Sequence, residues 1–211
     1  MDTTFLPLAG IVGALFLGVI SPGPSFIMVA REAMSLSRGN GLAAAVGMGL
    51  GGAAFGTLAL LGVNALFVAV PALYVLLKLA GGAYLCWLGW RIAGGAREPL
   101  PEASADGRAA RSVRGSLAYG LVTQLSNPKT AVVYASVFAA FLPGAVTLVQ
   151  GAALLATIFV METGWYAVVA VVLSAPGPRA TYARCKAWID RGAGAVMAGL
   201  GVRLVVGAVR A

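Results

Sequence analysis

Long apolar runs, separated by short polar segments, dominate the pattern of the chain. A helix that crosses a bilayer needs roughly 20 apolar residues. Six runs meet this need, at about 5–30, 42–63, 72–93, 114–142, 145–173 and 192–209. Their polar and apolar positions do not alternate as the strands of a membrane β-barrel require. The pattern therefore predicts an all-α, polytopic membrane protein with six transmembrane helices.

The composition excludes several other classes of protein. Of the 211 residues, 60% are hydrophobic and 10% are charged, whereas soluble domains contain about 45–50% apolar and about 25% charged residues. Histidine is absent, which removes His metal ligands, His proton relays and Ser-His-Asp catalysis. Cys86 and Cys185 lie far apart and form no CxxC motif, so neither a disulfide nor a zinc site is predicted.

The distribution of basic residues predicts the orientation of the chain. The connections after the first, third and fifth runs hold most of the 15 Lys and Arg residues, whereas those after the second and fourth hold none. The net charge of +8 therefore comes mainly from basic loops, and no nucleic-acid partner is expected. By the positive-inside rule, the linker 94–113 and a basic loop at 174–191 face the cytoplasm, and both termini face outward.

The polar, proline-rich linker divides the chain into two halves, 1–93 and 114–211, with three spans each. Prolines interrupt the first span of each half, at Pro22 and Pro128. The third spans match at a constant offset of 112 residues, in pairs that include Gly82 with Gly194 and Gly89 with Gly201. Because each half has an odd number of spans, the halves would be inverted three-helix repeats, as in many secondary transporters.

The two interrupted spans predict a substrate site. Their residues are Ser21, Pro22, Gly23 and Pro24 in the first half, and Asn127, Pro128 and Lys129 in the second. Proline breaks the helical hydrogen bonding, and freed backbone groups are tolerated at membrane depth only inside protein or beside a cavity. The half-helix that follows a break also presents a positive N-terminus, which suits a carboxylate. The alternative is that each break is only a structural kink.

Three charged residues lie within the apolar runs. Lys129 is too deep to reach water easily, at a cost of roughly 2.5–3.5 kcal/mol, so we expect it to bind substrate, to gate, or to be a satisfied structural lysine. Lys78 lies nearer a helix end and can snorkel, so a binding role and a structural role both stay open. Glu162 is the candidate for proton coupling, which needs an acid that gains and loses a proton within the membrane. A salt bridge of Glu162 with Lys78 or Lys129 is the alternative.

The second run contains the GxxxG pairs Gly47/Gly51 and Gly52/Gly56. Such pairs give a helix a smooth face that another backbone can approach closely. We therefore expect tight helix packing in this region. The same glycine faces would also suit a homodimer.

Four motifs, in order along the chain, resemble those of the lysine exporter and homoserine–threonine exporter (LysE/RhtB) family. They are Ser21-Pro22-Gly23-Pro24, the stretch Gly39-Asn40-Gly41-Leu42 leading into Gly47 and Gly51, Lys78-Leu79-Ala80-Gly81-Gly82-Ala83-Tyr84-Leu85 with Gly89, and Asn127-Pro128-Lys129. The resemblance covers about residues 5–210. It implies a six-helix exporter of amino acids or their derivatives in the bacterial inner membrane, driven by the proton gradient. It also implies a substrate region at the two broken spans, and no enzymatic activity or cofactor.

Other functions are compatible with a six-helix plan. A metal-ion exporter is the main alternative, but it needs hard oxygen, His or thiol ligands that converge in the membrane. A thiol–disulfide electron carrier would need two cysteines that face each other. A non-transporting scaffold would use the glycine faces for packing alone. The expected partners of the exporter are its amino-acid substrate, protons and the lipid bilayer.

Overall fold

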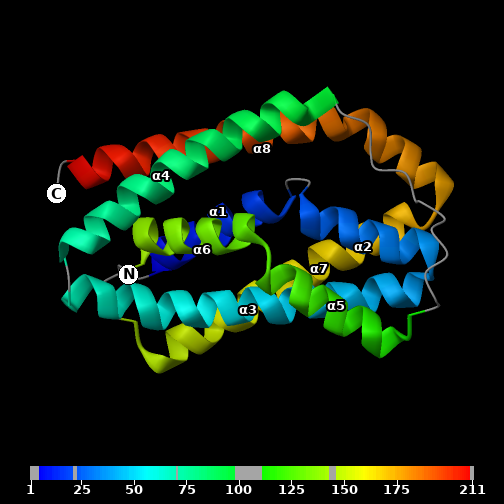
Figure 1. The fold of residues 1–211 in the computed structure, drawn as a ribbon, viewed down its shortest axis with the longest axis horizontal. Helices are drawn as coiled ribbons and strands as arrows, with labels where there is room; N and C mark the ends of the chain where they lie inside the picture. Colours follow the sequence, from blue (N-terminus) through cyan, green and yellow to red (C-terminus); the bar gives the residue numbers. More distant parts are fainter. Residues whose placement is uncertain (1–4, 21–22, 70, 98–110, 143–145, 210–211) are drawn as a thin grey trace.

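The computed structural model describes residues 5–20, 23–69, 71–97, 111–142 and 146–209. They form helices and no strands, which confirms the all-α class (Figure 1). The elements are α1 (Phe5–Ile20), α2 (Pro24–Ser35), α3 (Arg38–Ala69), α4 (Pro71–Gly94), the short 3-10 helix η1 (Gly95–Arg97), α5 (Val113–Leu125), α6 (Pro128–Phe141), α7 (Leu148–Leu173) and α8 (Pro176–Val209).

Three helical segments of the described chain are long and apolar enough to cross a membrane, namely Arg38–Gly62, Leu148–Leu173 and Arg184–Val209. The bent pair α1 and α2 adds a fourth if it is one broken span. Helix α6 is apolar but shorter. A membrane protein with several spans is therefore supported, and the full count of six stays a prediction.

The helices form two groups with shorter helices between them (Figure 1). Helices α4 and α8 lie side by side along one edge, and α3 packs against α5 and α7 along the other. Helices α1, α2 and α6 lie between these edges. This arrangement places the ends of α1 and α5 and the beginnings of α2 and α6 inside the bundle.

The expected basic loop at 174–191 is wrong, because α8 begins at Pro176. Proline is accepted in the first turn of a helix, where its missing N–H has no helical partner. The residues that follow include good helix formers, and Lys186 and Asp190 pair at i,i+4 spacing on the helix. The basic residues in this segment therefore do not indicate an absence of helix.

The glycines of α3 pack as the GxxxG spacing predicted. A Cβ on Gly51 would lie 2.7 Å from the Gln124 Cβ on α5. A Cβ on Gly52 would lie 2.6 Å from the Glu162 carboxyl carbon on α7. The absence of side chains therefore lets two helices approach α3 from different sides.

Helices α4 and α8 also meet through glycines. A Cβ on Gly82 would lie 2.8 Å from the carbonyl oxygen of Gly201, and one on Gly194 would lie 2.5 Å from the carbonyl oxygen of Gly89. Both distances are to backbone atoms, which cannot move aside without shifting a helix. The two helices are therefore in backbone contact along this seam.

Gly89→Ala is expected to lower the stability of the purified protein by about 1–3 kcal/mol, the usual cost of overpacking. The new methyl group would lie 2.7 Å from the Ala198 nitrogen on α8. Gly199→Ala is the matched control, because a Cβ there meets no atom within 4 Å of the described structure. Thermal unfolding in detergent measures both variants, and equal midpoints would show that the seam tolerates side chains.

Candidate functional site

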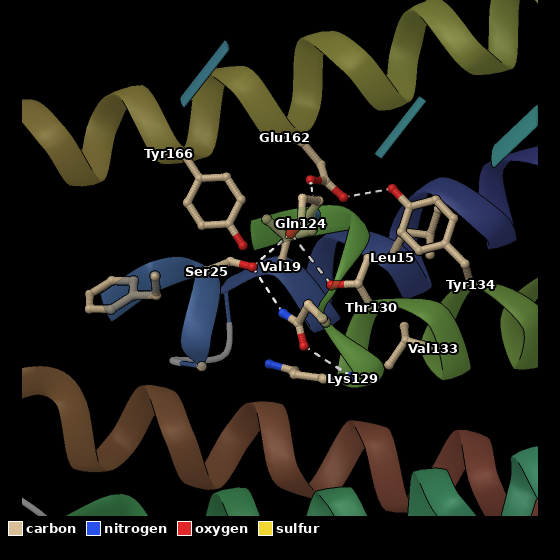
Figure 2. Close-up of a pocket in the computed structure, with 14 residues that line it drawn as sticks. Leu15, Val19, Ser25, Gln124, Lys129, Thr130, Val133, Tyr134, Glu162 and Tyr166 are labelled. Carbon is tan, nitrogen blue, oxygen red and sulfur yellow. Dashed lines mark hydrogen bonds between the residues drawn. The ribbon is translucent and has the colours of Figure 1, made fainter. Parts of the chain in front are cut away.

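A cavity lies where the two helix breaks meet (Figure 2). We call α1, α2, α5 and α6 half-helices, because α1 ends at Ile20 before α2 begins at Pro24, and α5 ends at Leu125 before α6 begins at Pro128. The polar side chains that line the cavity come from three of these helices and from α7, and they are Ser25, Gln124, Asn127, Lys129, Thr130, Tyr134, Glu162 and Tyr166.

Glu162 projects from α7 into this cavity and is fully buried. One carboxylate oxygen accepts a hydrogen bond from the Gln124 amide nitrogen at 2.5 Å. The other accepts from the Tyr134 hydroxyl at 2.6 Å. Both of these partners are uncharged. Gly52 leaves the space that the carboxyl group occupies.

The hydrogen bonds continue from Gln124 across both breaks (Figure 2). The Gln124 carbonyl oxygen accepts from the Ser25 hydroxyl at 2.6 Å. The Ser25 oxygen accepts in turn from the Asn127 amide nitrogen at 2.9 Å. The hydroxyl of Tyr166 points toward Ser25 in the same view. One polar network therefore joins α2 from the first half of the chain to α5, α6 and α7 from the second half.

The two half-helices that follow the breaks have different N-termini. At α6, the Asn127 side chain accepts from the Lys129 amide at 3.0 Å and caps the helix. At α2, the N-cap residue is Gly23, and no side chain caps the helix. The N-terminus of α2 therefore presents its positive end, without a competing side-chain acceptor from its N-cap, to the cavity that Gly23 lines.

Lys129 brings a positive charge to the same place. A Cβ on Gly23 would lie 3.2 Å from the Lys129 ammonium nitrogen, so the ammonium rests against the start of α2. Figure 2 shows this side chain at the edge of the cavity, beside the ribbon of α8. An ammonium and a helix N-terminus at one point attract a carboxylate more strongly than either alone.

The structure brings together four of the residues predicted for the site. Gly23, Asn127, Lys129 and Glu162 all line the cavity. Pro24 and Pro128 are exposed first residues of α2 and α6, where they create the breaks without lining the cavity. Lys78 is half-buried on α4 and does not line it. Ser21 and Pro22 lie outside the described residues.

Five of the eight polar side chains that line the cavity were not predicted from the sequence. Ser25, Gln124, Thr130, Tyr134 and Tyr166 all line it. The amide of Gln124 within an apolar run was an available signal, as was the position of Ser25 one residue after Pro24. For the two tyrosines there was no signal, because tyrosine in a membrane span is also common at the bilayer interface.

A second buried polar cluster lies farther along α2. The Glu32 carboxylate accepts from the Arg111 guanidinium at 2.5 Å and from the Ser116 hydroxyl at 2.6 Å. The Asn40 amide donates to the Ser116 oxygen at 2.7 Å. These bonds tie α2 and the start of α3 to the end of the predicted linker and to α5. They hold the two halves of the chain together on that side of the cavity.

The cysteines and acids of the described chain form no further site. No group of three or more His, Cys, Asp or Glu side chains in that part of the chain lies close enough to hold a metal ion. The Cys86 thiol on α4 donates to the Ala198 carbonyl oxygen at 3.5 Å, and Cys185 is exposed.

Comparison with known proteins identifies relatives over nearly the whole chain. The family model described as LysE type translocator matches residues 16–208. The threonine efflux protein of Escherichia coli (strain K12) is 34% identical over 192 residues, which cover 90% of this chain and 93% of that protein. The threonine efflux protein of Salmonella typhi is 32% identical over 191 residues, with coverage of 90% and 93%. The leucine efflux protein of Enterobacter sp. (strain 638) is 33% identical over 132 residues, 63% of this chain and 61% of that protein. No solved structure matches the chain significantly.

Proposed function

Because the chain belongs to the LysE type translocator family, we propose that it is a secondary transporter that exports an amino acid or an amino-acid derivative across the bacterial inner membrane. The family relationship agrees with the four motifs of the sequence. The named relatives export threonine and leucine. The observation that carries the proposal is the polar cavity between the two helix breaks, with Lys129 beside the uncapped N-terminus of α2.

The substrate carboxylate binds at the positive end of this cavity. The Lys129 ammonium and the start of α2 supply the charge, and charge-assisted hydrogen bonds of this kind contribute about 1.5–3 kcal/mol each. The substrate ammonium binds at the opposite pole of the breaks. There the C-terminal ends of α1 and α5 carry partial negative charge.

Alternating access follows from two inverted repeats of three spans each. The α4–α8 seam supports this design, because the offset of 112 residues between the third spans also relates its contacts. Gly82 corresponds to Gly194 and Gly201 to Gly89 by this offset, so the Gly82–Gly201 contact and the Gly194–Gly89 contact are equivalent. A two-fold axis through the seam would relate the two contacts in this way. We propose that one repeat rocks against the other around the cavity, with both termini outside and the linker in the cytoplasm.

Glu162 couples the cycle to protons. Its carboxyl group is buried among uncharged donors from α5 and α6, so a proton on it removes a charge from the interior of the bundle. Protonation also changes which hydrogen bonds the group makes, because a carboxylic acid donates where a carboxylate only accepts. Gln124 transmits that change to Ser25, and so to the break between α1 and α2.

Counterflow in proteoliposomes tests the proposal. Vesicles loaded with one unlabelled amino acid at a time are given the same labelled amino acid outside, with and without an imposed pH gradient. We expect exchange of one class of amino acid, enhanced by the gradient, and no exchange in vesicles without protein. No exchange of any amino acid by folded, inserted protein would contradict the proposal and favour the metal-ion or scaffold alternatives.

A further inference from the structure

Asp190 on α8 is a second buried acid close to the site. Its side chain is almost fully buried, at 2% exposure. One carboxylate oxygen accepts from the Lys186 ammonium at 2.7 Å. The other is buried and has no hydrogen-bond partner among the residues that the structure describes. Burying a carboxylate oxygen without a hydrogen-bond partner costs free energy, so other interactions of the carboxylate must offset that cost.

The helix face that carries Asp190 packs behind the cavity. Asp190, Ala193 and Met197 share one face of α8 by their spacing of three and four residues, and all three are buried. The Met197 methyl group would lie 3.7 Å from a Cβ on Gly18, which lines the cavity. Lys129 lies next to α8 in Figure 2, and Asp190 is close enough to act on it electrostatically.

The charges of this group do not balance. Lys129, Asp190 and Lys186 together carry two positive charges and one negative charge. Lys186 is itself buried and donates a second hydrogen bond to the carbonyl oxygen of Gly95. One further negative charge would neutralise the three residues. Glu162 lines the same cavity as Lys129, but its hydrogen bonds come from the uncharged side chains of Gln124 and Tyr134.

We propose that Asp190 is the internal counter-ion of Lys129, and that it competes with the substrate carboxylate for the Lys129 ammonium. The inference rests on the proposed function for the identity of the ligand. Asp190 is a positioning residue in this scheme. It holds Lys129 while the cavity is empty and weakens substrate binding enough for release. The expected ligand carries one carboxylate. When it binds, its negative charge and that of Asp190 together balance the positive charges of the two lysines.

The first part of the test needs no substrate. Lys129→Met, Asp190→Asn and the double variant are purified, and their thermal unfolding midpoints are compared. If the two residues interact, the double variant loses less than the sum of the single losses, by about 2–4 °C for each kcal/mol of coupling. Arg203→Gln combined with Asp190→Asn is the matched control. It removes a charge 13 residues farther along α8, roughly 20 Å away, and we expect additive losses.

The second part measures the competition. Asp190→Asn is expected to lower the half-saturating amino-acid concentration about fivefold or more, the lower range of coupling between sites, without raising the maximal exchange rate. Lys186→Met breaks the same Lys186–Asp190 pair but keeps the acid, so a structural role would affect both variants alike. An unchanged half-saturating concentration in Asp190→Asn, or additive midpoints in the first part, would overturn the inference. Coupled midpoints in a protein that exchanges no amino acid would contradict the proposed function and leave the ion pair standing.

Discussion

Lys129→Ala is expected to reduce amino-acid exchange in proteoliposomes roughly 10- to 100-fold, as the loss of a charge-assisted hydrogen bond to a carboxylate predicts. The ammonium rests against the N-terminus of α2 at the edge of the cavity. Asn127, at the same break, is uncharged, and its side chain caps α6. The substrate carboxylate would then face only the partial charge of the helix end, which is worth about 0.3–1 kcal/mol at most sites.

The control for this variant removes a positive charge elsewhere in the bundle. Arg203 on α8 is exposed and lies over the ring of Phe141, outside the cavity. Arg203→Gln should therefore exchange amino acids at the rate of the unmodified protein. Size-exclusion profiles confirm that both variants are folded. Exchange by Lys129→Ala at the unmodified rate, in well-inserted protein, would remove Lys129 from the binding mechanism.

The helix breaks could be predicted from the sequence, because proline and glycine act locally. Pro128 begins α6 with Asn127 as its cap, as the motif indicated. In the first half of the chain, the predicted start of the helix after the break was less accurate. Pro24, rather than Pro22, begins α2 and is equivalent to Pro128. A motif with two prolines within three residues does not reveal which of them starts the helix, since both accept that position.

The partners of the charged residues could not be predicted, because they depend on tertiary contacts. A salt bridge of Glu162 with Lys78 or Lys129 was the alternative to proton coupling, whereas the hydrogen bonds of Glu162 in the structure come from Gln124 and Tyr134. Asp190 was missed because the basic residues around it suggested a loop. It pairs with Lys186 inside the helix, and this pairing is what allows both charges to be buried.

Glu162→Gln is expected to abolish the effect of a pH gradient on uptake while exchange without a gradient persists. Glutamine has the shape of a protonated glutamate and carries no charge at any pH. Its carboxamide oxygen can accept from one of the two donors, and the Tyr134 hydroxyl can accept from its amide. The cost in stability is then about that of one rearranged hydrogen bond, 0.5–1.5 kcal/mol. The ratio of uptake with and without the gradient should fall to about 1, because a site that binds no proton cannot be driven by one.

Tyr134→Phe separates proton coupling from the packing of the network. It removes the donor to one Glu162 oxygen, whose bond is 2.6 Å long, and keeps the acid. Phe138 and Phe55 already flank the Tyr134 ring, so a phenyl group fits the same space. This variant should transport more slowly but still respond to the gradient, because the group that takes up the proton is intact. If Glu162→Gln kept the full response to the gradient, the coupling proton would have to bind elsewhere, and Asp190 is then the buried acid to substitute next.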